Sequence, residues 1–180
     1  GLGRSGLAAA HALLAGGALV RAWDDEAPAR ARAAGEGIPL ADLARDGLAG
    51  VHTLVLSPGI PHTHPAPHPV AEIARRQGCE IVCDIELMAR SATEAAYIGV
   101  TGTNGKSTTT ALLGHILAAS GRDVEMGGNF GVPALALRPL GAGGTYVLEL
   151  SSYQLELIHR AACDVAVLLN ITPDHLDRHG

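Results

Sequence analysis

The segment GVTGTNGKSTTT (residues 99–110) constrains the fold of this chain more than any other feature. It stands between an apolar, β-rich run and an Ala/Leu-rich run that ends at Gly121. Glycines between a strand and a helix let backbone N–H groups curl around an anion, and the helix N-terminus and a lysine add positive charge. The segment therefore predicts a phosphate-binding loop in an α/β protein.

The loop departs by one residue from the common phosphate-loop pattern G-x-x-x-x-G-K-[ST]. That pattern requires glycine at position 100, where this chain has Val100. An ordinary glycine-rich turn is the alternative, but it leaves Lys106 without a role at the junction of strand and helix. Phosphate binding is the better interpretation, with the Ser107 hydroxyl placed on Mg²⁺.

Short β-rich runs alternate with helical runs along the chain, which is typical of α/β proteins with parallel strands. A proline-rich stretch, PGIPHTHPAPHP (residues 58–69), excludes regular structure there. Helices are predicted over Ser5–Leu14, residues 70–78, residues 85–90 and Lys106–Ser120. Strands are predicted over Ala18–Trp23, His52–Ser57, residues 80–84, Ala96–Thr101, residues 123–127, Thr145–Ser151 and Asp164–Ile171.

Two α/β units in tandem are expected, with a hinge at Ser91–Ala95. The fold class is α/β: a Rossmann-like N-terminal domain over residues 1–92, followed by part of a P-loop-type ATPase central domain with a parallel sheet over residues 93–180. The first unit lacks its opening strand and the second its end. We therefore expect a piece of a longer protein.

Composition excludes some classes of function. The formal net charge of −5 argues against a general nucleic-acid binder, which needs a basic face. The apolar stretch Leu7–Val20 is too short to span a membrane and is broken by His11 and glycines. Three cysteines without CxxC spacing indicate a reduced, cytoplasmic protein with small buried thiols rather than a metal site at Cys79 and Cys83.

Two later strands end in polar residues, where parallel sheets collect their ligands. Glu149 closes one apolar strand and is a candidate metal ligand beside the phosphate loop, although a solvated strand end is the alternative. The other strand ends in NITPDHLDRH, which offers Asn170, Asp174, His175, Asp177 and His179 to the same metal or to a phosphate. A surface turn would have a similar sequence.

The opening segment GLGRSG satisfies G-x-G-x-x-G, and acidic residues at Asp24 and Asp25 follow at the spacing of a dinucleotide fold. An NAD-dependent oxidoreductase is one interpretation, and a nucleotide diphosphate docked on the helix N-terminus is the narrower one. The segment SPGIP (residues 57–61) is placed to close over that ligand. His62, His64 and His68 resemble a metal cluster, but prolines around them favour solvent-exposed histidines.

TGTNGKST in place of the standard phosphate loop resembles the Mur ligases, the ATP-dependent amino-acid-adding enzymes of peptidoglycan synthesis. Within that family, the chain is most similar to the branch that adds D-glutamate. The motifs that carry this resemblance, in chain order, are GLGRSG, SPGIP, CDIEL, GGNFG, LELSSYQLE and NITPDHLDRH. A sister ligase adding another amino acid, or a folate-polyglutamylating enzyme, remains an alternative.

The resemblance implies ligation of D-glutamate to UDP-N-acetylmuramoyl-L-alanine, with ATP and Mg²⁺ as cofactors. ATP phosphorylates the terminal carboxylate of the substrate, and the amine of D-glutamate then attacks the acyl phosphate. The protein is expected to be a cytoplasmic monomer without nucleic-acid partners or membrane insertion. The family also uses a carbamylated lysine, an adenine pocket and a third domain, which we place beyond Gly180. We therefore expect the 180-residue chain alone not to complete the ligation.

Carried over residue by residue, the resemblance implies catalytic roles for Lys106, Glu149 and His175. Mg²⁺ would be held by Ser107 and Glu149, with His175 at a second Mg²⁺ near the substrate carboxylate. The ATP phosphates would be bound by Gly102, Thr103, Asn104, Gly105, Lys106, Ser107 and Thr108, with Lys106 on the β and γ oxygens.

Substrate contacts follow from the same resemblance. Asn129 and Ser151 match positions that contact the muramoyl-alanine part, and His175 is also expected to bind the substrate. The UDP group would be held by Gly3, Arg4, Ser5, Asp24, Ser57, Pro58 and Gly59. The chain departs from the family after Asp24, because Asp25 and Glu26 add negative charge near a uridine diphosphate.

Overall fold

The structure is a computed structural model and describes residues 1–179. The chain is α/β, and every strand pair in it is parallel, as predicted. Its residues form two compact units, one of Gly1–Asp84 with the segment that begins at His175, and one of Ile85–Asp174. The functional domain boundary between residues 92 and 93 stays a prediction, because compactness alone does not assign a helix to a functional domain.

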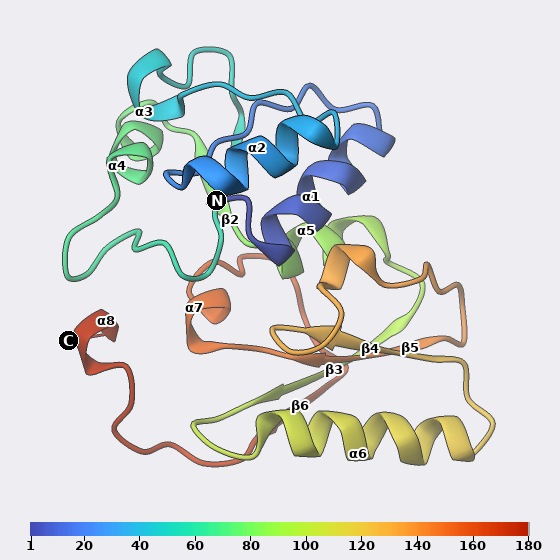
Figure 1. Ribbon diagram of the computed structural model, residues 1–180. Coiled ribbons are helices and arrows are strands. Elements are labelled where there is room, and N and C mark those ends of the chain that lie inside the picture. The colour runs from blue at the N-terminus through green and yellow to red at the C-terminus, as the bar shows by residue number, and fades with distance from the viewer. Residues whose placement is uncertain (180) are drawn as a thin grey trace. The chain divides into compact units, whose positions relative to one another are not determined.

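The first unit consists of helices and one pair of short strands (Figure 1). Strands β1 (Thr53–Val55) and β2 (Glu80–Val82) pair in parallel, with Thr53 opposite Glu80. A small apolar cluster of Leu2, Ala10, Ala33 and Ile38 joins the first two helices. The helices of this unit are α1 (Arg4–Ala15), α2 (Ala27–Gly35), α3 (Leu43–Asp46), α4 (Pro69–Arg76) and α8 (Leu176–His179).

One expectation for the first unit is wrong, and helix α2 was not foreseen. The strand predicted over Ala18–Trp23 is reduced to one bridge between Ala22 and Leu40, since a strand forms only where a neighbour pairs with its backbone. Leu19 in that segment is fully exposed. Helix α2 was not predicted, because its sequence APARARAAG has no apolar period; alanine propensity and a proline in the first turn support the helix instead.

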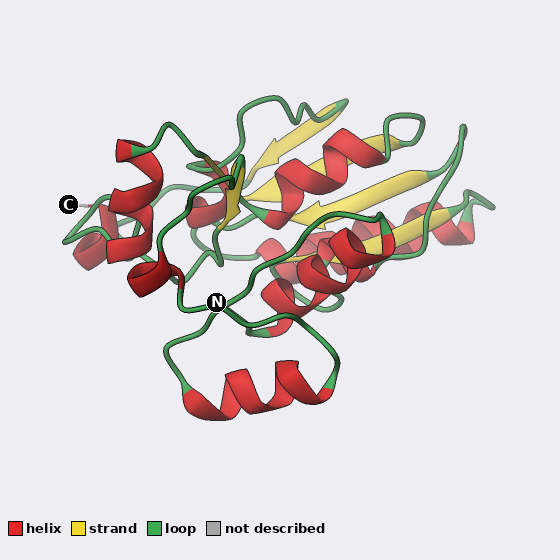
Figure 2. Cartoon of the chain, turned by 90° about the horizontal axis from the view of Figure 1, so that it is seen from above, coloured by secondary structure: helices red, strands yellow, loops and turns green. Residues whose placement is uncertain are grey.

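The second unit is built on a four-stranded sheet of order β4-β5-β3-β6. Its strands are β3 (Ala96–Thr101), β4 (Val124–Gly128), β5 (Thr145–Glu149) and β6 (Val165–Leu168), and they point the same way in Figure 2. Helix α6 (Lys106–Ala119) lies along one face of the sheet and packs on β3, β4 and β5 (Figure 1). The unit also contains most of α5 (Asp84–Ser91), the short 3-10 helix η1 (Ala134–Ala136) and α7 (Ser152–Leu155).

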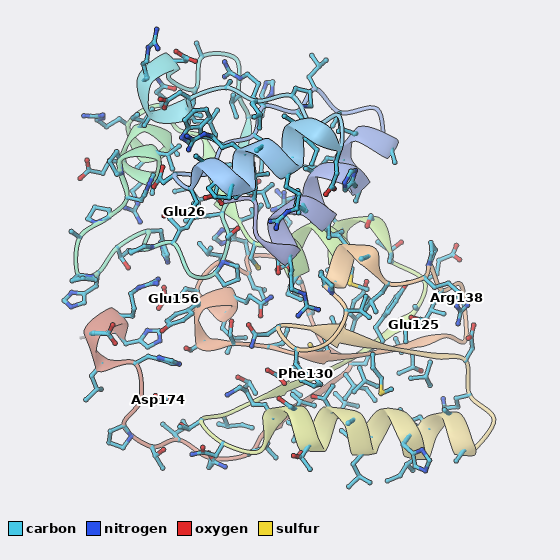
Figure 3. The ribbon with its side chains drawn as sticks, in the orientation of Figure 1. Glu26, Glu125, Phe130, Arg138, Glu156 and Asp174 are labelled. Carbon is cyan, nitrogen blue, oxygen red and sulfur yellow. The ribbon has the colours of Figure 1, made fainter. Side chains whose placement is uncertain are left out.

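Strand β5 is the most deeply buried of the described strands, since all five of its residues are buried. The hydroxyl of Tyr146 accepts a hydrogen bond from the Leu140 N–H and donates one to the Arg138 carbonyl, which fastens the preceding loop to the sheet. The Arg138 guanidinium in turn binds Asp123 and Glu125, which lies beside it in Figure 3. These contacts hold β4 and β5 in register. They therefore help to position the carboxyl end of β5, where Glu149 lies.

Both later strands end sooner than predicted. The strand expected to reach Ser151 stops at Glu149, because the Ser151 side chain caps helix α7. The strand expected to reach Ile171 stops at Leu168, and the residues after it turn toward the phosphate loop. Among residues 1–179, no helix combines the length and apolar character that a membrane span requires.

Candidate phosphate and metal site

The loop between β3 and α6 has a backbone that only glycine adopts readily. Gly102 has φ 137° and Gly105 has φ 86°, both in the region that disfavours residues with a Cβ. A Cβ on Gly102 would also lie 3.0 Å from the Asn170 carbonyl oxygen. The two glycines thus let the chain reverse direction tightly at the carboxyl end of β3.

Four successive backbone N–H groups at the start of α6 are left open by this turn. The first hydrogen bond of the helix runs from Thr109 N–H to the Gly105 carbonyl (3.0 Å). Within the described residues, the N–H groups of Gly105 through Thr108 donate to no acceptor. Together with the positive end of the helix dipole, they are suited to an anion, and phosphate binding by this loop stays a prediction.

The Lys106 side chain adds a full positive charge to this site. Its Nζ donates to the carbonyl oxygens of Gly102 (2.7 Å) and Thr103 (2.9 Å), so that the ammonium lies folded back across the loop. A phosphate oxygen bound to the open N–H groups competes directly with those carbonyls for Lys106. The loop therefore supports the phosphate role predicted from the sequence.

Glu149 lies at the carboxyl end of β5, opposite Val100 of β3. Its side chain is buried (2% exposed), yet no basic side chain of residues 1–179 pairs with its carboxylate. The carboxylate accepts hydrogen bonds from Ser107 Oγ (2.7 Å) and Asn129 Nδ2 (3.0 Å). The negative charge of a buried carboxylate is not compensated by two neutral donors, so a cation beside it would be strongly stabilised.

The donor set around Glu149 fits Mg²⁺. A carboxylate and a hydroxyl are hard oxygen ligands, and Mg²⁺ at phosphate sites takes one or two protein ligands with the remaining positions filled by phosphate oxygens and water. No group of three or more His, Cys, Asp or Glu side chains within residues 1–179 forms a metal site by itself. The structure thus favours a metal that enters with the phosphate, next to Ser107 and Glu149.

The two predicted substrate residues near Glu149 already have local partners. Asn129 donates its side-chain amide to Glu149, and its backbone N–H donates to the Glu149 carbonyl (2.9 Å). Ser151 is the N-cap of α7, where its hydroxyl accepts from the Gln154 N–H (3.2 Å) in a capping box. These contacts place both residues at the sheet edge beside Glu149. Their contact with the muramoyl-alanine part stays a prediction.

His175 is the one non-glycine residue of the described range with a positive φ (52°). Such a conformation is uncommon and often accompanies a functional constraint. His175 belongs to the first compact unit, whereas Ser107 and Glu149 belong to the second. Its predicted role as ligand of a second Mg²⁺ therefore stays a prediction.

The first glycine motif has a different local geometry. Gly3 is the N-cap of α1, followed by Arg4 and Ser5 in the first turn, and its φ of −68° requires no glycine. The carboxylate of Asp24 accepts from the N–H groups of Leu2 (2.6 Å) and Glu26 (2.9 Å). Burial opposes ionisation of Asp24, but these two N–H groups, together with the positive charges of the N-terminus and Arg30, lower the pKa of the carboxyl group. Asp24 thus holds the loop before α1 in place.

The Ser57–Gly59 turn lies at the same end of the first unit. Ser57 Oγ donates to the Gly1 carbonyl (3.2 Å), and Pro58 and Gly59 form a turn after β1. The Gly59 carbonyl accepts from Arg178 Nη1 (3.2 Å). The turn therefore contacts the glycine motif, as expected for a segment that closes over the same ligand, and uridine diphosphate binding remains to be tested.

The histidines of the proline-rich loop do not converge. His62 contacts Arg75, whereas His68 contacts Asp25 and caps helix α4, with only 22% of its side chain exposed. The expectation that all three histidines are solvent-exposed therefore holds for His64 and is wrong for His62 and His68, which are both half-buried. Cys79 and Cys83 are buried thiols as expected, but Cys163 is exposed, which corrects the prediction for that residue.

Two long-range sets of hydrogen bonds were not foreseen from the sequence. Asn170 binds the backbone of the phosphate loop, and Glu86, 0% exposed, binds three backbone N–H groups of His159, Arg160 and Ala161. These partners lie 66 to 75 residues apart in the chain. No local pattern reveals such pairs, although Glu86 lies in the motif CDIEL.

Comparison with known proteins agrees with this geometry. Residues 100–180 match the model of the Mur ligase middle domain. The whole chain is 57% identical to the UDP-N-acetylmuramoylalanine–D-glutamate ligase of Rhodospirillum rubrum, of which it covers 39%. It is 55% identical over its whole length to the protein of the same name from Phenylobacterium zucineum, of which it covers 40%. The chain thus spans about two fifths of the length of these relatives.

Solved structures show the same fold. The UDP-N-acetylmuramate:L-alanyl-gamma-D-glutamyl-meso-diaminopimelate ligase from Neisseria meningitides aligns with a TM-score of 0.57 at 18% identity, over 99% of this chain and 60% of that one. A murein peptide ligase from Psychrobacter arcticus aligns with a TM-score of 0.54 at 18% identity, over 98% of this chain and 42% of that one. Residues 100–180 therefore match the Mur ligase middle domain, and the chain as a whole is similar to ligases of that family.

Proposed function

We propose that this chain is the nucleotide- and substrate-binding part of an ATP-dependent ligase that adds D-glutamate to UDP-N-acetylmuramoyl-L-alanine in peptidoglycan precursor synthesis. The contact between Ser107 Oγ and Glu149 Oε2 (2.7 Å) carries the proposal, because Ser107 also belongs to the run of open N–H groups at the start of α6. The names of the relatives at 55–57% identity supply the substrates.

The chemistry begins with an unreactive carboxylate. A carboxylate oxygen of the substrate attacks the γ-phosphorus of ATP, the bond to the β-phosphate oxygen breaks, and ADP leaves. The amine of D-glutamate then attacks the carbonyl carbon of the acyl phosphate, loses a proton, and expels inorganic phosphate. Phosphoryl transfer of this kind depends on positioning and on charge neutralisation more than on covalent help from the protein.

The residues of the loop are suited to that task. The N–H groups of Gly105 through Thr108 hold the phosphate oxygens, and Lys106 moves from the loop carbonyls to the β and γ oxygens. Ser107 and Glu149 hold Mg²⁺, which neutralises negative charge on the phosphates when bound. Asn129 keeps the Glu149 carboxylate oriented, because its amide donates to Oε1 (3.0 Å).

The remaining assignments complete the proposal. Residues 1–92 form the domain that binds the UDP group, and residues 93–180 form part of the ATP-binding domain. His175 serves a second Mg²⁺ near the substrate carboxylate. The enzyme works in the cytoplasm as a monomer. Its UDP contacts are Gly3, Arg4, Ser5, Asp24, Ser57, Pro58 and Gly59.

Replacing Lys106 with alanine in the full-length protein tests the proposal. We expect Lys106→Ala to reduce the D-glutamate-dependent release of ADP at least hundredfold, because the transferred phosphoryl group loses its main fixed positive charge. The release of ADP would be measured with each substrate omitted in turn.

Arg122→Ala is the matched control, since Arg122 is an exposed basic residue just beyond the other end of α6. This variant should keep wild-type turnover. Retention of most activity by Lys106→Ala, or equal losses in both variants, would show that the loop does not hold the reacting phosphate.

A further inference from the structure

The phosphate loop is fastened to the segment that follows β6. Five hydrogen bonds join Thr103 and Asn104 of the loop to Asn170 and Thr172. They continue the pairing of β3 with β6 past its last rung, where Leu169 N–H donates to the Thr101 carbonyl (3.0 Å). We call these four residues the loop clamp.

The Asn170 side chain is the centre of the loop clamp. Its Oδ1 accepts from the Asn104 N–H (2.9 Å), and its Nδ2 donates to the Asn104 carbonyl (3.0 Å). The Asn170 backbone carbonyl accepts from the Thr103 N–H (3.0 Å). One residue thus satisfies three backbone groups of two successive loop residues, in the manner of a strand neighbour.

Thr103 and Thr172 form the second half of the loop clamp. The Thr103 hydroxyl donates to the Thr172 carbonyl (3.2 Å) and accepts from the Thr172 N–H (3.0 Å). Gly102 allows the approach, because a Cβ there would lie 3.0 and 3.1 Å from backbone atoms of Asn170. The side chain of Thr103 is therefore turned toward the β6 segment rather than presented to a ligand.

The loop clamp divides the predicted phosphate loop into two parts. The N–H groups of Thr103 and Asn104 are consumed by Asn170, whereas those of Gly105 through Thr108 are open within the described residues. The N–H groups of Thr103 and Asn104 are therefore not available to an anion, whereas the four at the start of α6 are. The clamped half sets the direction in which those donors point.

We propose that Asn170 is a positioning residue for the nucleotide: it holds the phosphate loop in the conformation that aims the Gly105–Thr108 N–H groups at the phosphates. The inference rests on the proposed function and adds to it a residue outside the loop. Asn170 is exposed, so its hydrogen bonds contribute little to the stability of the folded chain. Its effect appears in nucleotide binding. A phosphate loop that Asn170 does not hold must be ordered when the nucleotide binds, and this ordering lowers the affinity.

The test uses the full-length protein and measures MgATP affinity, the affinity for UDP-N-acetylmuramoyl-L-alanine and the denaturant midpoint of each variant. Asn170→Ala removes both side-chain bonds to Asn104. We expect about tenfold weaker MgATP binding and a matching rise in the KM for ATP, since two hydrogen bonds that order the loop are lost. Affinity for the UDP substrate and the denaturant midpoint should stay at wild-type values.

A matched pair at Thr103 tests the same loop clamp by another route. Thr103→Val keeps the shape of the side chain and removes the hydroxyl, whereas Thr103→Ser keeps the hydroxyl. We expect several-fold weaker MgATP binding for Thr103→Val and recovery to within twofold of wild type for Thr103→Ser. If Asn170→Ala does not fold, the MgATP affinities of these two variants still test whether the loop clamp positions the loop.

The outcomes separate the two proposals. If the wild-type protein fails to bind MgATP, the proposed function falls and this inference falls with it. If the wild type binds MgATP and Asn170→Ala binds it equally well, only the positioning role is overturned. A parallel loss of affinity for the UDP substrate would also overturn it, because that result indicates a general defect in folding.

Discussion

Two buried glutamates of the second unit have opposite surroundings. Glu86, on α5, is completely buried and accepts hydrogen bonds from three backbone N–H groups and from the Arg90 guanidinium (2.8 Å). Glu149, at the end of β5, is 2% exposed, and within residues 1–179 its carboxylate accepts only from Ser107 and Asn129. One carboxylate has its charge fully compensated by the protein, and the other does not.

This difference is the one expected between a structural carboxylate and the metal ligand that we propose. Burial opposes ionisation of Glu86, but the backbone N–H groups and Arg90 outweigh it and lower its pKa to about 2. Glu86 thus joins α5 to the loop before β6 and needs nothing further. Glu149 is held in place by neutral donors beside an anion-binding helix terminus, which is a suitable place for a metal ion that arrives with a phosphate.

The largest effect expected from this comparison is on catalysis, in the variant Glu149→Gln. Turnover should fall at least hundredfold, because the amide keeps the shape of the side chain but does not compensate a divalent cation. The free energy of unfolding should stay within about 1 kcal/mol of wild type or rise, since an uncompensated buried charge is removed. Steady-state kinetics and urea titration of the same preparation measure both quantities.

Glu125→Gln is the control for that variant, because Glu125 lies on the neighbouring strand β4 and forms an ion pair with Arg138 (Figure 3). It should retain wild-type turnover. A stability loss of several kcal/mol in Glu149→Gln, with the remaining folded protein active, would erase the distinction between the two glutamates.

The next effect is on stability, in the variant Glu86→Gln. We expect a loss of about 2 kcal/mol of unfolding free energy at neutral pH, allowing for solvent screening of Arg90, which is 27% exposed. Catalytic turnover should be unchanged at temperatures where the variant is folded. A variant as stable as wild type would show that the four donors to Glu86 contribute nothing.

The smallest effect is the pH dependence of that stability difference. Because the folded-state pKa of Glu86 is lowered to about 2 from an ordinary value of 4.5, its contribution is complete above about pH 4.5 and is lost as the pH falls toward 2. The unfolding free energies of wild type and Glu86→Gln should therefore converge between these values. A difference that is constant across this range would assign the destabilisation to packing instead of charge.

The sequence predicts well those features that consecutive residues encode. Strand β3 and helix α6 follow from local patterns, because a strand, a glycine turn and a helix beginning with Lys106 are encoded within consecutive residues. Glu149 follows from one further rule, that ligands gather at the carboxyl ends of parallel strands. Its hydrogen bond to Ser107 agrees with that expectation.

Other features depend on contacts that no local pattern contains. The role of Glu86 requires a loop 73 to 75 residues later in the chain, and the role of Asn170 requires a backbone 66 residues earlier. Helix α2 lacks apolar periodicity, and the Ala18–Trp23 segment has strand composition but pairs only at Ala22. In these cases tertiary contacts decide the structure against or beyond local propensity.

The central claim is that nucleotide phosphates bind at the N-terminus of α6 with a metal ion beside Ser107 and Glu149. A crystal structure of the full-length protein with Mg²⁺ and a non-hydrolysable ATP analogue tests it most directly. The β and γ phosphate oxygens should lie within hydrogen-bond distance of Lys106 Nζ and the N–H groups of Gly105 through Thr108, with the metal next to Glu149. The central claim would be contradicted if the ATP analogue were bound at Gly1–Gly6 and the N-terminus of α6 held no phosphate.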